Sequence, residues 1–176
     1  KMYHMTFHMQ GFMKSMENAS PSEIDGIKPD TFPTRLRKIA ESFKTDIVDK
    51  GYDYFACVLN TDSYDGNGKH WVALLVDVKK KNIEYFDSVG QDPYKDVVEW
   101  IAEIKDNVSG GSTNKKEWKE WETPVINKYR HQNENFDCGV FSTYYIVQRI
   151  LHKEPFKSFH KPDAKLTDSY MRDVVR

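Results

Sequence analysis

The chain has 176 residues, close to the usual size of one domain, and its formal net charge is -1 at pH 7. Hydrophobic residues make up 39% and charged residues 30%, a balance typical of a folded globular protein rather than a disordered chain. The near-zero charge disfavours a dedicated nucleic-acid binder, which needs a basic surplus, and no run of about 18 apolar residues predicts a membrane span.

The first fifty residues carry the weakest pattern. Residues 1–16 are rich in methionine and aromatic residues and favour a short helix, and residues 17–33 are dense in turn formers. Residues 34–49 place apolar side chains at helical spacing, and Gly51 follows as a stop. We therefore expect a helix over 34–49 that covers the core.

A group of strands comes next. Residues 54–60 and 70–78 are rich in β-branched and aromatic residues, and the second segment is apolar on both faces, as in a central strand. The polar turn 79–82 leads into a third strand over 83–88, so the last two strands should form a hairpin.

The second half of the chain alternates helix and strand. Apolar spacing predicts a helix over 94–108, and residues 121–129 predict a strand in which Pro124 favours an edge or an irregular start. Another helix is expected over 138–151, and a last one from about Thr167. This order predicts an α+β fold with a central mixed β-sheet flanked by helices. One domain over residues 1–176 should have three parts: an N-terminal helical and irregular part (1–50), a core (51–151) and a helical tail (152–176).

Two cysteines, Cys57 and Cys138, have different settings. A single disulfide is not expected in a chain without an apolar leader. Cys57 lies inside an apolar strand and should be inert. Cys138 begins a predicted helix, where unpaired amides and a partial positive charge stabilise a thiolate.

Three further side chains complete a candidate catalytic group around Cys138. His70 begins the central strand, and Asp87 lies at the same end of the hairpin, so its carboxylate can orient the imidazole. Gln132 can donate to an oxyanion together with the Cys138 backbone N–H. Gly139 leaves room beside the nucleophile for substrate.

Each of these residues also has an ordinary structural explanation. A cysteine at the start of an apolar helix is often a small core residue, His70 could be a strand-edge histidine, and Asp87 could cap a turn. His131, beside Gln132, is expected to be a surface loop residue rather than a rival base. The remaining histidines lack the spacing of a zinc site, so no metal and no cofactor are predicted.

Three sequence strings occur in an order that resembles a known family. GKHW (68–71), IEYFDSVG (83–90) and QNENFDCG (132–139) are similar to the His-Trp, aromatic-Asp-Ser-x-Gly and Gln-x5-Cys-Gly motifs of the cysteine proteases that include SUMO-specific proteases and adenovirus protease. With FACVLNTD and YRHQNENFDCG, the chain most resembles the polyprotein-processing proteases of African swine fever virus and related large DNA viruses. The likeness covers residues 54–151.

The resemblance implies a cysteine endopeptidase with a catalytic triad of His70, Asp87 and Cys138. Gln132 would serve as the oxyanion donor, and Trp71 would wall a narrow cleft that accepts a Gly-Gly segment. The implied substrate is a polypeptide cleaved after small residues at a Gly-Gly-x site, in the first instance a viral structural polyprotein matured during virion assembly. An intracellular location follows, in the host cytoplasm or the virion.

Three alternatives stay open at the level of sequence. The chain could be an isopeptidase that removes ubiquitin or a SUMO-like protein, or an acyltransferase that passes the same thioester to an amine. A binding module with a decayed site is the alternative that is not an enzyme.

Overall fold

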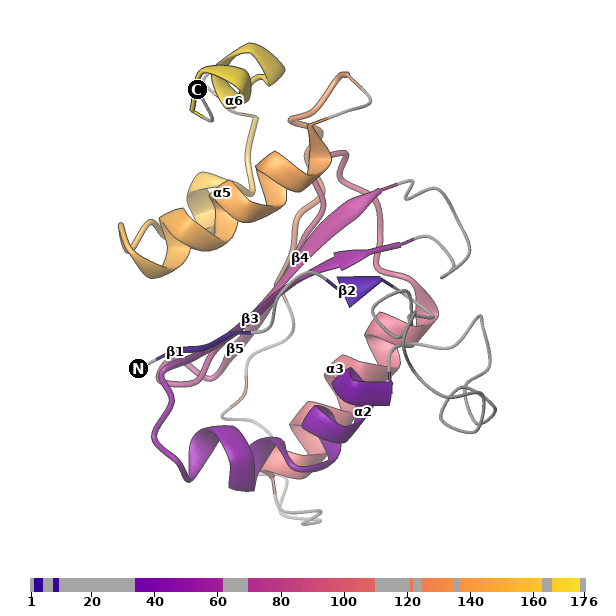
Figure 1. Ribbon diagram of the computed structural model, residues 1–176, viewed down its shortest axis with the longest axis vertical. Helices are drawn as coiled ribbons and strands as arrows, with labels where there is room; N and C mark the ends of the chain where they lie inside the picture. The colour runs from indigo at the N-terminus through magenta and orange to yellow at the C-terminus, as the bar shows by residue number, and fades with distance from the viewer. Residues whose placement is uncertain are drawn as a thin grey trace, which may run out of the picture.

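The computed structural model describes residues 2–4, 8–9, 34–61, 70–109, 121, 125–134, 137–162 and 166–174. A mixed six-stranded sheet forms the centre of the molecule. Helices α2 and α3 cover one face of the sheet, and α5 covers the other with α6 outside it (Figure 1). None of the helices in these ranges is long and apolar enough to cross a bilayer.

The sheet is built around three antiparallel strands, β3, β4 and β5, with short parallel strands at both edges. Its strands are β1 (Met2–His4), β2 (His8–Met9), β3 (Tyr54–Asn60), β4 (Trp71–Asp77), β5 (Asn82–Phe86) and β6 (Val125–Ile126). β1 and β2 pair with β3, and β6 pairs with β5. The hairpin predicted for β4 and β5 is present, with Ala73 opposite Phe86.

Side chains of the central strands alternate between two apolar cores, as the period of two in a strand requires. Phe55, Cys57 and Leu59 face the core beneath α2 and α3, whereas Ala56 faces the core beneath α5. Both faces of the sheet are therefore covered, which explains why β4 reads as apolar on both faces.

A helix is present in each segment where apolar spacing predicts one. They are α2 (Thr34–Glu41), the π-helix η2 (Lys44–Val48), α3 (Lys95–Val108), α5 (Cys138–Ile150), the 3-10 helix η3 (Phe156–Ser158) and α6 (Asp168–Val174). α3 buries Val97, Trp100, Ile101 and Ile104 against the sheet. The Trp100 indole N–H donates to the Leu36 carbonyl at 2.8 Å, which joins α3 to α2.

Three predictions need correction. Residues 2–4 and 8–9 are strands rather than part of a helix, because pairing with the edge of β3 satisfies their backbone groups; the rest of the segment 1–16 lies outside the described residues. Of the strand predicted over 121–129, the described residues form a strand only at Val125–Ile126, and residues 122–124 lie outside the described ranges. The helix predicted over 34–49 is α-helical only to Glu41 and then widens into η2.

A buried ion pair fastens α5 to the sheet. Arg149 on α5 donates from Nε to a carboxylate oxygen of Glu84 on β5 at 2.8 Å, and its Nη2 donates to the other oxygen. The Tyr145 hydroxyl also donates to Glu84. Because Glu84 is fully buried and Arg149 is 2% exposed, this pair sets how α5, and therefore its first residue, lies on the sheet.

Candidate active site

Cys138 is the first residue of α5 and is 5% exposed. Burial raises the pKa of its thiol. A hydrogen bond with His70 and backbone hydrogen bonds from Trp71 and Gly139 lower that pKa by more than burial raises it, so the net shift is downward from 9.0. All three contacts stabilise negative charge on sulfur. The helix start adds a partial positive charge at the same point. Cys138 thus has the environment of a reactive thiol.

His70 lies directly before β4, and Asp87 lies directly after β5. The hairpin register brings them together, so that His70 Nε2 donates to Asp87 Oδ1 at 2.8 Å. Nδ1 is then the ring nitrogen that remains for the Cys138 sulfur. Burial lowers the pKa of His70, but the hydrogen bonds with Asp87 and Cys138 outweigh it and raise the pKa to about 9.

The opposite shifts of the two pKa values have a chemical consequence. Because its pKa is raised to about 9, His70 keeps its proton at neutral pH. Because its pKa is lowered from 9.0, Cys138 loses its proton at a lower pH than an ordinary cysteine does. The two shifts together favour a thiolate–imidazolium pair of Cys138 and His70 over two neutral groups. Such a pair attacks an electrophile without prior proton transfer and carries a proton for the leaving group.

The Asp87 carboxylate is held by the turn that follows it. Its Oδ1 also accepts from the Val89 backbone N–H at 2.7 Å, and its backbone carbonyl accepts from Asn127 Nδ2 at 2.7 Å. Gly90 closes this turn with φ +75°, and a Cβ there would lie 2.9 Å from backbone atoms of Lys128 and Tyr129. Only glycine fits both requirements.

Gln132 is 3% exposed and held at both ends of its amide. The Ser88 hydroxyl donates to Gln132 Oε1 at 2.6 Å, and Gln132 Nε2 donates to the Glu134 carbonyl. The Ser88 carbonyl accepts from the backbone N–H groups of His131 and Gln132 at 2.7 and 3.0 Å. Because an amide carries two N–H donors, the contact with Glu134 leaves a second one for an oxyanion.

Trp71 and Gly139 lie against each other beside Cys138. A Cβ built on Gly139 would be 3.6 Å from the Trp71 ring, an ordinary van der Waals distance. The structure therefore provides the ring beside the nucleophile, but it does not make glycine a steric necessity at position 139.

The prediction that His131 is a surface residue is wrong. His131 is 3% exposed, its Nε2 bonds to the Phe159 carbonyl at 2.7 Å, and its ring stacks on Phe86. The ring packs inward because the loop after β6 is tied to Ser88.

Cys57 is 1% exposed, and burial raises the pKa of its thiol to about 12, as expected of an inert core cysteine.

Sequence reasoning missed two residues that hold the site, Ser88 and Asn127. Ser88 lies inside the IEYFDSVG string, so its position next to Asp87 was a signal. Asn127 follows the short strand β6, and nothing in its local sequence indicated a bond to Asp87. Throughout the described ranges, no group of three or more His, Cys, Asp or Glu side chains is placed to hold a metal ion.

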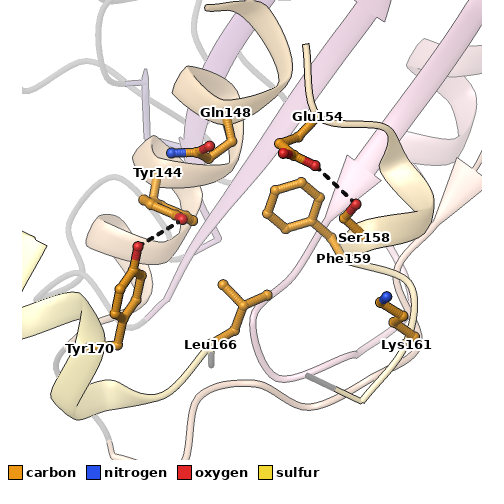
Figure 2. Close-up of a pocket in the computed structure, with 8 residues that line it drawn as sticks. All are labelled: Tyr144, Gln148, Glu154, Ser158, Phe159, Lys161, Leu166 and Tyr170. Atoms are coloured by element: carbon orange, nitrogen blue, oxygen red, sulfur yellow. Dashed lines mark hydrogen bonds between the residues drawn. The ribbon is translucent and has the colours of Figure 1, made fainter. Parts of the chain in front are cut away.

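A cavity of about 260 Å³ lies between α5, η3 and the C-terminal segment (Figure 2). Its lining comprises Tyr144, Gln148, Glu154, Ser158, Phe159, Lys161, Leu166 and Tyr170. Within this lining, the Tyr144 and Tyr170 hydroxyls are 3.2 Å apart. None of the candidate catalytic residues lines this cavity.

Comparison with known proteins identifies the family of this chain. The model of the Ulp1 protease family, C-terminal catalytic domain, matches residues 3–174. The chain belongs to this family. It is therefore a cysteine protease domain with the α+β fold predicted from the sequence.

Several proteins similar to this chain come from African swine fever virus. Its SUMO-1 cysteine protease is 34% identical over 127 residues, which is 71% of this chain and 43% of the viral protein. One crystal structure of the viral protease covers 94% of this chain and 55% of its own with TM-score 0.59 and 26% identity. Another covers 68% and 42%, with TM-score 0.53 and 33% identity. The chain thus spans about half the length of these relatives.

Proposed function

We propose that this family member is an endopeptidase in which Cys138, His70, Asp87 and Gln132 carry the chemistry. The observation that supports the proposal most strongly is that His70 bonds to both Asp87, at 2.8 Å, and Cys138. The hydrogen bonds that shift both pKa values favour a thiolate–imidazolium pair over two neutral groups.

The proposed reaction passes through an acyl-enzyme. The Cys138 thiolate attacks the scissile carbonyl, and the oxyanion receives hydrogen bonds from Gln132 Nε2 and the Cys138 backbone N–H. His70 then gives its proton to the leaving amine as the C–N bond breaks, which leaves a thioester. Neutral His70 takes a proton from water as the water attacks the thioester, and the thiolate leaves with the imidazolium restored.

The proposed specificity is for small residues before the cut, in a Gly-Gly-x site. Trp71 supports this because its ring lies beside Gly139 and Cys138, where a bulky side chain next to the scissile bond would meet the indole. We propose an extended polypeptide as the substrate, in the first instance a viral structural polyprotein. Removal of a SUMO-like protein is the second candidate, which the name of the viral relative, SUMO-1 cysteine protease, favours.

The test compares two substrates with the unmodified chain and Cys138→Ala. The first is a peptide with an internal Gly-Gly-Ala site, and the second is SUMO with a short C-terminal extension. We expect cleavage of the peptide after Gly-Gly, lost in Cys138→Ala, with a Phe-Phe-Ala peptide as the control that stays intact. Cleavage of the SUMO fusion but not the peptide would replace the polyprotein proposal with the second candidate. Failure of Cys138 to react with any electrophile near neutral pH would contradict the proposed chemistry.

A further inference from the structure

The loop that carries Gln132 is held from outside by the last helix. Asp168 opens α6, and its carboxylate accepts from the backbone N–H of Asn133 at 2.9 Å and from that of Glu134 at 3.3 Å. These are the two residues that follow Gln132, and the Glu134 carbonyl is the acceptor for Gln132 Nε2. Asp168 thus lies two hydrogen bonds away from the proposed oxyanion donor.

The Asp168 carboxylate is not needed to cap its own helix. Thr167 does that, because its hydroxyl accepts from the Tyr170 backbone N–H at 3.2 Å. Asp168 is 6% exposed although it carries a carboxylate. A buried carboxylate is costly unless it is hydrogen-bonded, and the partners that the structure provides are the two N–H groups of the loop.

α6 is itself anchored on the body of the domain. Met171 is fully buried and Leu166 is 7% exposed in the core beneath α5. Figure 2 shows Leu166 and Tyr170 facing α5, with the Tyr170 hydroxyl 3.2 Å from that of Tyr144. The packing of α6 on the domain therefore places Asp168 beside the loop.

A second contact between α6 and the loop is weaker. Arg172 pairs with Glu134 at 2.6 and 3.1 Å, but the two side chains are 46% and 53% exposed. Exposed ion pairs contribute little to stability. The buried Asp168 is the tether with the larger effect.

We infer that Asp168 is a positioning residue that fixes the loop 132–134 so that Gln132 is held ready for the oxyanion. The inference rests on the proposed function, because it assigns Asp168 to the oxyanion side of that site. A displaced donor weakens stabilisation of the transition state while the Cys138–His70 pair stays intact. Alkylation of Cys138 by iodoacetamide forms no oxyanion, so Asp168 should matter for hydrolysis and not for alkylation.

The experiment uses Asp168→Ala, Asp168→Asn and the matched control Ser169→Ala, which removes an exposed hydroxyl on the same helix. With a Gly-Gly peptide amide, Asp168→Ala should lower kcat by about 10- to 100-fold, the range expected for a misplaced donor. KM and the rate of Cys138 alkylation should change less than about twofold. Asp168→Asn, which keeps one acceptor oxygen, should lose less activity, and Ser169→Ala should match the unmodified chain.

Amide hydrogen exchange gives a readout that does not depend on turnover. Asp168→Ala should speed exchange at Asn133 and Glu134 and leave β4 protected, and Asp168→Asn supplies the same measurement if the alanine variant does not fold. Unchanged kcat, unchanged exchange at the loop, or an equal fall in hydrolysis and alkylation would overturn the inference. If the unmodified chain hydrolyses no peptide while exchange still rises in the variant, the proposed function fails and the tether itself stands.

Discussion

The contact between His70 and Asp87 leads to a prediction about thiol reactivity. In Asp87→Asn the amide oxygen can still accept from His70 and from the Val89 N–H, so the turn keeps its bonds. What disappears is a negative charge that lies 2.8 Å from Nε2 and is 1% exposed. Burial of His70 lowers its pKa, and in this variant one of the interactions that oppose this effect is lost. The pKa of His70 should fall, and the pKa of Cys138 should rise, since His70 is its charge partner.

The size of the effect follows from the shift of His70. Its pKa lies at about 9 instead of 6.5. Each pH unit is a factor of ten in the ratio of imidazolium to imidazole, so loss of most of this shift corresponds to about 100-fold. Because Cys138 also contributes to the shift, we expect alkylation of Cys138 at pH 6.5 to slow by about 10- to 100-fold. Peptide hydrolysis should fall at least as much.

The assay is the rate of iodoacetamide addition, followed by intact mass from pH 5 to 10. In the unmodified chain the rate should rise through the lowered pKa of Cys138 and then stay level, since thiolate persists at high pH. kcat/KM should fall again near pH 9, where His70 loses the proton it must donate. Asp49→Asn, which removes a surface carboxylate paired with Lys44, is the control. An unchanged alkylation profile in Asp87→Asn would refute the reasoning.

Three further predictions concern stability and reactivity. Gly90→Ala combines a positive φ with contacts at 2.9 Å and should lower the free energy of unfolding by about 2 to 4 kcal/mol, measured by urea denaturation; a loss below half a kcal/mol would contradict it. Arg149→Met leaves the buried Glu84 charge unpaired and should cost about 3 to 5 kcal/mol, whereas the double variant with Glu84→Gln should recover part of the loss; equal losses would contradict it. Cys57, with its pKa raised to about 12, should stay unmodified in the folded protein and react only in urea, as peptide mapping after alkylation would reveal.

Prediction from sequence succeeded where the pattern was local. The hairpin of β4 and β5 was predicted from two apolar runs and a polar turn, and it is present. Helices α3 and α5 begin within one residue of their expected starts. The N-terminal strands were missed because edge pairing with β3 depends on a partner about fifty residues away, and such pairing leaves no periodicity in a segment of two or three residues.

The sequence by itself determined which residue types are available for catalysis and in what order they occur. His70, Asp87 and Cys138 could be named because strand ends and a helix start are encoded by nearby residues. Only the tertiary structure decided how the site is supported. Ser88 donates a hydrogen bond to Gln132, which lies 44 residues away in the sequence, and Asp168 accepts one from Asn133, which lies 35 residues away. The physical reason is that a hydrogen bond between distant segments depends on how layers pack, and the burial of a polar side chain such as His131 follows from that packing rather than from its neighbours in the chain.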